Sequence, residues 1–281
     1  MANDDKPLRI DLQAIVRERL SPAKRRFVPR ALVRGLERLV HQDDLNGILE
    51  RTYPKEGSEF ARAALDDLQI KVNVKGRENI PADGRLIFAS NHPLGGLDGI
   101  TLIAVLGEIY GDERLRFPVN DLLLNVRPLR KVFLSVNKLG RQARSASRAL
   151  NDAYASDDKQ MLIFPAGLCS RKGKGGRIAD LMWQKSFVAK AIENRRDIVP
   201  VTFVGRNTNR FYNTARWRRR LRIGINIEQV LLPGELCKAR GKEFTIIFHK
   251  PIPWQSLTEE NKKPAELAAA IRDLVLASYP Y

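Results

Sequence analysis

The segment LIFASNHPLGGLDG, residues 86–99, decides the fold. Its first five residues, Leu86–Ser90, form a short apolar run of strand length, typical of a strand buried on both faces of a sheet. Proline and glycines at 93–96 signal a tight turn, and a helical pattern then runs from Asp98 to Tyr110. A buried strand that leads through a turn into a helix predicts an α/β domain.

The same alternation continues along the chain. Further apolar runs predict strands at 115–119, 131–136, 161–164, 198–204, 223–227 and 244–249, and helical patterns lie at 141–154, 185–194 and 264–278. Residues 8–70 have a helical pattern, broken at Ser21-Pro22 and near 54–57. We therefore expect an α/β fold, with a mixed sheet flanked by helices over 76–281, preceded by a helical and basic N-terminal arm over 1–75.

The composition excludes several protein classes. With 281 residues, 43% of them hydrophobic, the chain can bury a sizeable core, which excludes a disordered protein. Two cysteines cannot form a disulfide framework, and with three dispersed histidines they offer no metal-ligand spacing. The first residues are acidic without an apolar segment, and no uncharged apolar run approaches the ~20 residues of a membrane span. We expect a soluble or peripheral intracellular protein that uses no metal or other cofactor.

Positive charge is concentrated in three segments. Lys and Arg number 49 against 32 Asp and Glu, a net charge of +17. Residues 24–38 carry a local charge of +5, residues 171–177 carry +4, and residues 206–222 carry +7 without any acid. Such patches attract nucleic acid, anionic lipid headgroups or an acidic carrier protein.

Two of these segments have features beyond charge. Arg30, Arg34 and Arg38 recur every four residues on a predicted helix whose other face is apolar. This pattern suits a membrane interface, and an ordinary solvated surface helix fits it as well. The segment 206–222 mixes aromatic residues with arginines, among them Arg216, Trp217, Arg218 and Arg219. That mixture suits an interfacial anchor and equally a single-stranded nucleic-acid groove.

His92 is the strongest candidate for a catalytic side chain. It directly follows the strand at 86–90, whereas His41 and His249 lie within periodic apolar segments. Its only close acidic neighbour is Asp98, and the two can meet only if the chain folds back at 93–96. A carboxylate bonded to one ring nitrogen would make His92 a general base. The equal alternative is that Asp98 merely caps the following helix.

A second loop, FPAGLCSRKGKGGR at 164–177, leaves the strand predicted at 161–164. Backbone N–H groups and cations in such a glycine-rich loop can bind an anion or an oxyanion. The loop matches neither the phosphate-binding loop of nucleotidases nor a dinucleotide fingerprint. Cys169 could be a nucleophile, but the sequence identifies no partner that would stabilise a thiolate, which favours a small buried residue.

These loops resemble, in order, the conserved blocks of the lysophospholipid acyltransferase superfamily. The blocks are Asn91-His92 with Asp98, then Phe164-Pro-Ala-Gly167, then Ile198–Val201. Residues 132–138 resemble the remaining block and place Lys138 where a basic acceptor-binding residue is expected. Four blocks in order are far more specific than any one of them.

The likeness is closer to a bacterial branch, also labelled haemolysin, that includes the O-acyltransferases of glycine-lipid and ornithine-lipid synthesis. It covers roughly residues 20–255 and includes segments 41–46, 91–99, 119–121 and 180–187. The resemblance implies transfer of a fatty acyl group from an acyl carrier protein or coenzyme A thioester to the hydroxyl of a lyso-lipid. Residues 76–281 would form the acyltransferase domain.

The resemblance also implies roles for individual residues. His92 would take the hydroxyl proton while Asp98 orients it, and the acceptor oxygen would attack the thioester directly, without a covalent enzyme intermediate. The oxyanion- and acceptor-binding residues would be Asn91, Lys138, Gly167, Ser170 and Arg171. The basic segments would hold the protein on an anionic membrane, at the cytoplasmic face of the inner membrane, and dock an acidic carrier protein.

Three differences from the superfamily pattern bear on the acceptor. Five residues instead of four separate His92 from Asp98, Ala166 replaces an acidic residue, and Cys169 replaces an arginine. The last two changes remove groups associated with a glycerol-phosphate acceptor. We therefore expect a mono-acylated amino-acid lipid of the glycine- or ornithine-lipid type.

Three alternatives stay open at this point. One is a lysophosphatidate acyltransferase of phospholipid synthesis, and another is a relative that has lost activity. The third is a non-catalytic basic protein that binds membrane or nucleic acid. Nucleic acid is not the expected partner, because the chain has no helix-turn-helix, zinc-finger or aromatic RNA-binding signature.

Overall fold

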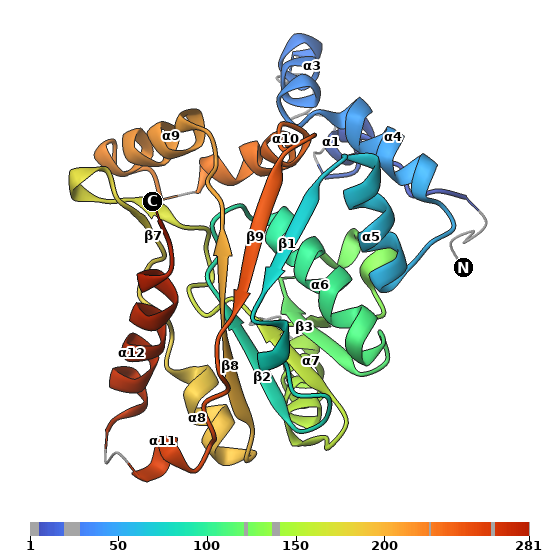
Figure 1. Ribbon diagram of the computed structural model, residues 1–281. Coiled ribbons are helices and arrows are strands. Elements are labelled where there is room, and N and C mark those ends of the chain that lie inside the picture. Colours follow the sequence, from blue (N-terminus) through green and yellow to red (C-terminus); the bar gives the residue numbers. More distant parts are fainter. Residues whose placement is uncertain are drawn as a thin grey trace.

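The computed structural model describes residues 6–19, 29–120, 123–136, 141–224, 226–259 and 262–280. This part of the chain forms a seven-stranded sheet in the order β1-β9-β8-β2-β5-β3-β4 (Figure 1). Its strands are β1 (Lys71–Lys75), β2 (Leu86–Ser90), β3 (Leu115–Val119), β4 (Phe133–Ser135), β5 (Gln160–Ile163), β8 (Asp197–Val204) and β9 (Glu243–Phe248). All neighbours pair in parallel except β8 and β9, so the predicted α/β fold with a mixed sheet is confirmed.

Helices cover both faces of this sheet (Figure 1). They are α1 (Leu12–Arg19), α3 (Arg30–Leu39), α4 (Gln42–Thr52), α5 (Gly57–Asp67), α6 (Gly96–Tyr110), α7 (Arg141–Ala155), α8 (Ser186–Glu193), α9 (Asn209–Arg220), α10 (Leu232–Cys237), α11 (Ser256–Glu259) and α12 (Pro264–Ala277). One core cluster joins α5 and α6 to the sheet, and a second joins α7, α8 and α12 to it. Strand β2 is buried at every residue because both clusters pack against it, as its apolar run predicts.

The arm consists of α1, α3, α4 and α5, and α5 attaches it to the sheet by packing on α6. The predicted break at Ser21-Pro22 lies outside the described residues. The boundary expected at residue 75 needs correction, because β1 belongs to the sheet and pairs with β9. Only Val72 and Val74 of β1 pack on the core, so its sequence KVNVK lacks the apolar run of the other strands.

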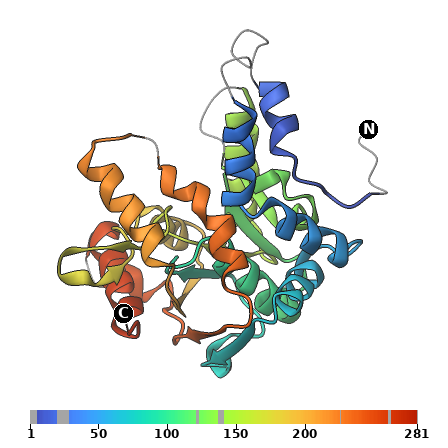
Figure 2. The same cartoon turned by 90° about the horizontal axis from the view of Figure 1, so that it is seen from above.

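The segment after β8 also differs from the expectation. Helix α9 occupies most of the arginine-rich stretch, and the residues described within 223–227 form no strand. They lead instead into η5 (Ile227–Leu231), a 3₁₀ helix. The pattern I-G-I-N-I imitates a strand, but Arg222 has a positive φ of 54°, which turns the chain at the end of α9. A short hairpin, β6 (Arg171–Lys172) and β7 (Ile178–Ala179), lies beside α9 (Figure 2).

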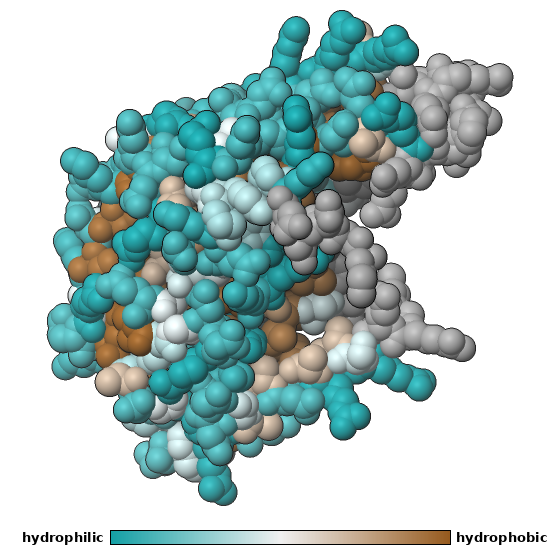
Figure 3. Space-filling view, turned by 90° about the vertical axis from the view of Figure 1, so that its right-hand side faces the viewer, coloured by the Kyte–Doolittle hydropathy of each residue, from teal (hydrophilic) through white to brown (hydrophobic). Residues whose placement is uncertain are grey.

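The surface is polar over much of the side that carries α4 and α5, where hydrophobic residues form separate patches (Figure 3). Within the described residues, no helix is long and apolar enough to cross a membrane.

Candidate active site

The turn between β2 and α6 brings His92 and Asp98 together. Gly95, just before the helix, has a φ of 84°, and a Cβ there would lie 3.3 Å from the Cys169 sulfur, so the position requires glycine. Asp98 is the third residue of α6 and points back toward the strand end. As a result, His92 Nδ1 lies 2.9 Å from Asp98 Oδ2.

Asp98 is a helix cap as well as a histidine partner. Its Oδ2 accepts the backbone N–H of Leu94 at 2.9 Å and that of Gly95 at 3.0 Å. Burial raises the pKa of this carboxyl, while the hydrogen bonds from His92 and the two amides oppose that rise. The two roles that the sequence presents as alternatives therefore occur in the same side chain, and the turn accommodates the five-residue spacing.

His92 contacts the second loop through two further residues. Its ring stacks on Phe164 with centroids 4.1 Å apart. Burial lowers the pKa of His92, but the effects of Cys169 and of the Asp98 carboxylate outweigh burial, and the pKa lies well above its usual value. The sequence did not indicate that Cys169 influences the pKa of the imidazole. The side chain of His92 remains 18% exposed.

Asp180 holds the two loops together, and the sequence reasoning missed it. This buried carboxylate accepts the backbone N–H of His92 at 3.1 and 3.2 Å, the Ser170 hydroxyl at 2.5 Å and the Trp183 indole N–H at 3.0 Å. The Ser170 N–H also donates to the His92 carbonyl at 2.7 Å. The only available signal was the resemblance of segment 180–187 to the bacterial branch.

Asn91 has a different role from the one expected. Its buried side chain donates to the Phe203 carbonyl at 3.0 Å and accepts the Phe203 N–H at 2.6 Å. Both polar groups are therefore used to join the end of β2 to β8. This corrects the expectation that Asn91 binds the acceptor, and makes it a residue that fixes the position of His92.

The loop after β5 uses the polar groups of Gly167 and Ser170 in hydrogen bonds within the protein. The Gly167 N–H donates to the Phe164 carbonyl at 3.0 Å, and Ser170 donates both its N–H and its hydroxyl. Neither residue therefore offers a free donor to an oxyanion in this conformation. The N–H groups of Leu168 and Cys169 make no backbone hydrogen bond to another described residue.

Arg171 is engaged in a buried ion triad. Glu228, fully buried in η5, pairs with Arg171 Nη2 and with Arg218 Nε, both at 2.8 Å. The expectation that Arg171 holds an anionic headgroup is corrected, because Glu228 balances its charge inside the protein. Arg218 is corrected in the same way: its side chain is only 13% exposed and ties α9 to η5 instead of facing a membrane.

The other predicted surface residues lie on the outside of the molecule. Arg30, Arg34 and Arg38 are exposed on α3, and Arg216, Trp217 and Arg219 are exposed on α9. Lys138 lies outside the described residues.

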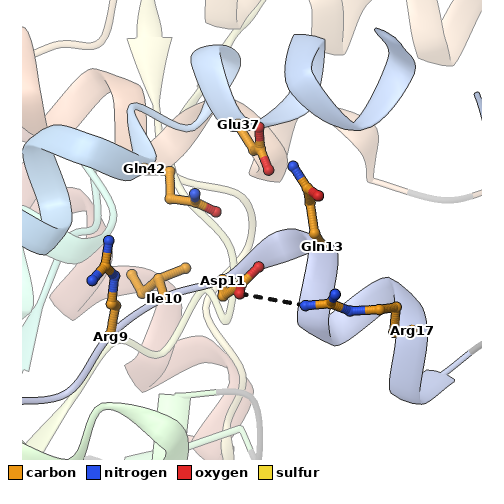
Figure 4. A pocket seen from close by; sticks show the side chains of 7 residues that line it. All are labelled: Arg9, Ile10, Asp11, Gln13, Arg17, Glu37 and Gln42. Carbon is orange, nitrogen blue, oxygen red and sulfur yellow. Dashed lines mark ion pairs between the residues drawn. The ribbon is translucent and has the colours of Figure 1, made fainter. Parts of the chain in front are cut away.

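A cavity of about 500 Å³ lies in the arm, away from the two loops (Figure 4). Its lining side chains come from the N-terminal segment, α1, α3 and α4: Arg9, Ile10, Asp11, Gln13, Arg17, Glu37 and Gln42. Asp11 and Arg17 face each other across it at 3.8 Å. The cavity contains none of the residues that surround His92.

The structure also gathers three potential metal ligands that are dispersed in the sequence. Donor atoms of His41, Asp44 and Cys237 lie within 4.8 Å of one another, although the three residues have no metal-ligand spacing in the sequence. His41 Nδ1 is 2.9 Å from Asp44 Oδ2. Burial raises the pKa of Cys237 to about 11, so a cation would first have to displace the thiol proton.

Comparisons with known proteins relate this chain to acyltransferases. A family model described as acyltransferase matches residues 15–267. The chain is 43% identical to a lyso-glycine lipid O-acyltransferase of Bacteroides thetaiotaomicron, over 97% of this chain and 98% of that protein. It is 42% identical to a protein of the same name from Phocaeicola vulgatus, over 97% and 96%. Among solved structures, it is similar to the 1-acyl-sn-glycerophosphate acyltransferase PlsC of Thermotoga maritima, with a TM-score of 0.46 and 17% identity over 85% of this chain and 91% of that one.

Proposed function

This chain belongs to the acyltransferase family and is an enzyme that transfers acyl groups, and we propose that its acceptor is the hydroxyl of a lyso-glycine lipid. The observation that carries the proposal is the buried pair of His92 Nδ1 and Asp98 Oδ2 at 2.9 Å, placed in the loop where the family resemblance locates the base. The names of two relatives that match nearly the whole chain support the acceptor.

The proposed reaction is a direct acyl transfer. His92 removes the proton from the acceptor hydroxyl, and the oxygen attacks the carbonyl carbon of an acyl thioester. Asp98 stabilises the imidazolium that forms, since its carboxylate already faces the ring. The tetrahedral intermediate expels the donor thiolate, which takes the proton back from His92. The products are the ester and the free thiol of acyl carrier protein or coenzyme A.

The tetrahedral intermediate carries an oxyanion that needs positioned donors. The backbone N–H groups of Leu168 and Cys169 are the proposed donors, because those of Gly167 and Ser170 are used within the loop and its surroundings. They therefore replace Gly167 and Ser170 in this role. Lys138 remains the proposed ligand for an anionic group of the acceptor.

The absence of acidic and basic side chains at two positions supports an amino-acid lipid over lysophosphatidate. Ala166 is buried and apolar, and Cys169 is buried beside His92. Cys169 cannot bind a phosphate as the arginine that it replaces would, and Ala166 lacks the carboxylate associated with a glycerol-phosphate acceptor. The proposed site of action is an anionic membrane surface, reached from the cytoplasm, where the lyso-lipid is found.

The test is an assay with purified protein and two donors, palmitoyl-acyl carrier protein and palmitoyl-coenzyme A. Each is combined with lyso-glycine lipid, lyso-ornithine lipid or lysophosphatidate in detergent micelles. We expect transfer to the lyso-glycine lipid and a loss of about 10²- to 10⁴-fold in His92→Ala. His249→Gln, which alters a histidine outside the loop, should stay active. Preferred transfer to lysophosphatidate would refute the acceptor, and an active His92→Ala would refute the base.

A further inference from the structure

Five large apolar side chains lie exposed along one short stretch of the chain. They begin on α9 and end on η5: Trp217 is 60% exposed, Leu221 65%, Ile223 37%, Ile227 41% and Val230 41%. Isolated exposed apolar residues are common on soluble proteins, but a run of them within 14 residues marks a contact surface. We call these five residues the α9 face.

Exposed cations accompany the α9 face, and Glu228, the one acid in the sequence from 206 to 230, is buried in the ion triad. Arg216, Arg219, Arg220 and Arg222 are exposed on the same stretch, and residues 206–224 contain no Asp or Glu. Arg220 lies 5.8 Å from the centroid of the Trp217 ring, so the aromatic side chain and the cation are presented together.

The β6–β7 hairpin extends this cationic rim. Lys172 and Arg177 are exposed there, and Arg219 Nη2 donates to the Lys172 carbonyl at 3.4 Å. Exposed apolar side chains and exposed cations therefore occur together on α9, η5 and the hairpin that packs against α9.

The α9 face lies at the same end of the molecule as the active-site loops. Strands β2, β5 and β8 are parallel and finish at the end where α9, α10 and α3 lie (Figure 1). The loop after β5 leads directly into β6, which packs against α9 (Figure 2). Helix α3, with Arg30, Arg34 and Arg38 exposed, lies at this end too. Both basic helices therefore lie at the end of the sheet where β2, the strand before His92, finishes.

We infer that the α9 face inserts into the interface of an anionic bilayer and thereby docks the enzyme with its catalytic loops toward the lipid. Tryptophan and aliphatic side chains partition into the headgroup region, while arginines around them pair with lipid phosphates. An acidic protein would need the cations but not five exposed apolar side chains. The inference rests on the proposed function, because a lyso-lipid acceptor lies in the membrane and binding there brings the enzyme to it.

The test measures binding separately from catalysis. The full-length protein is sedimented with vesicles of phosphatidylcholine alone or with 30% phosphatidylglycerol as the anionic component. We expect binding to the anionic vesicles that weakens with added salt, and at least a tenfold loss of affinity in the double variant Leu221→Ser/Ile227→Ser. The matched control is Leu274→Ser, which removes an exposed apolar side chain from α12, outside the face.

A second measurement covers the case in which the double variant fails to fold. Brominated lipids should quench the Trp217 fluorescence of the unmodified protein, and the quenched component should vanish in Trp217→Phe. Equal binding to neutral and anionic vesicles, full binding by the folded double variant, or binding only to acyl carrier protein would overturn the inference. Acyl transfer in detergent micelles reports on the proposed function independently, so the two ideas can fail separately.

Discussion

Replacing Asp180 with asparagine tests whether this carboxylate holds the catalytic loop in place. The two carboxylate oxygens of Asp180 accept from His92 N–H, Ser170 Oγ and Trp183 Nε1 at distances of 2.5–3.2 Å. Asn has one acceptor oxygen, so its NH₂ group must face at least one of these donors. Each buried polar group left without a partner costs about 1–3 kcal/mol. The asparagine NH₂ and the donor that it faces are two such groups. Removal of a buried charge offsets part of their cost, so the expected loss in the free energy of unfolding is about 2–4 kcal/mol.

The same substitution should alter catalysis in a way that instability alone does not. The charged carboxylate lies against the His92 backbone, and removing it lowers the pKa of the imidazolium. Since only neutral His92 acts as the base, the acidic limb of the kcat/KM profile should move to lower pH while kcat falls. Urea unfolding and a pH–rate profile measure the two effects, and Trp183→Phe, which removes one donor, is the milder control. Unfolding within 0.5 kcal/mol of the unmodified protein, with an unchanged pH profile, would show that Asp180 does not position the loop.

Three further substitutions follow from the geometry. Glu228→Gln leaves the buried Arg171 and the largely buried Arg218 without a counter-charge and should lower the free energy of unfolding by about 3–5 kcal/mol, and a loss below 1 kcal/mol in urea would contradict the ion triad. Asp98→Asn removes a contact that raises the pKa of His92, so the acidic limb of kcat/KM should shift to lower pH with at least a ~100-fold lower rate; an unshifted limb would argue against the pair. Cys169→Ala should remain active, and the unmodified protein mixed with acyl donor alone should gain no mass, because attack is direct; an acyl group found on Cys169 would refute that mechanism.

The sequence predicted correctly the strand in which every residue is buried, because burial makes each of its positions apolar or small. β2 was predicted with its observed bounds because both of its faces are buried, so every position is apolar or small. β1 was missed because alternate side chains face solvent at the sheet edge and three of its five residues are polar. The strand expected at 223–227 was wrong: Ile223 and Ile227 are exposed, and a pattern of hydrophobicity does not distinguish exposed apolar residues from buried ones.

Site residues that are close together in the sequence could be predicted, whereas contacts between residues far apart in the sequence could not. His92 and Asp98 lie in one turn, so their spacing and the glycines between them carried the information. Asp180 lies 88 residues from His92 in the sequence, and only the folded chain brings its carboxylate to the His92 backbone N–H. Arg171 looked like a free cation because its counter-charge, Glu228, is 57 residues further along the chain.

The position of β9 between β1 and β8 also sets the timing of assembly on the ribosome. β1 joins the sheet only through β9, so its hydrogen-bonding groups stay unpaired until about 170 more residues have been synthesised after Lys75. At roughly 5–20 residues per second, that wait lasts about 10–30 s. Until β9 is synthesised, β1 and the edge of β8 both lack the strand that lies between them in the finished sheet, and unpaired strand edges favour aggregation. A nonsense codon upstream of Glu243 would make that exposed state permanent.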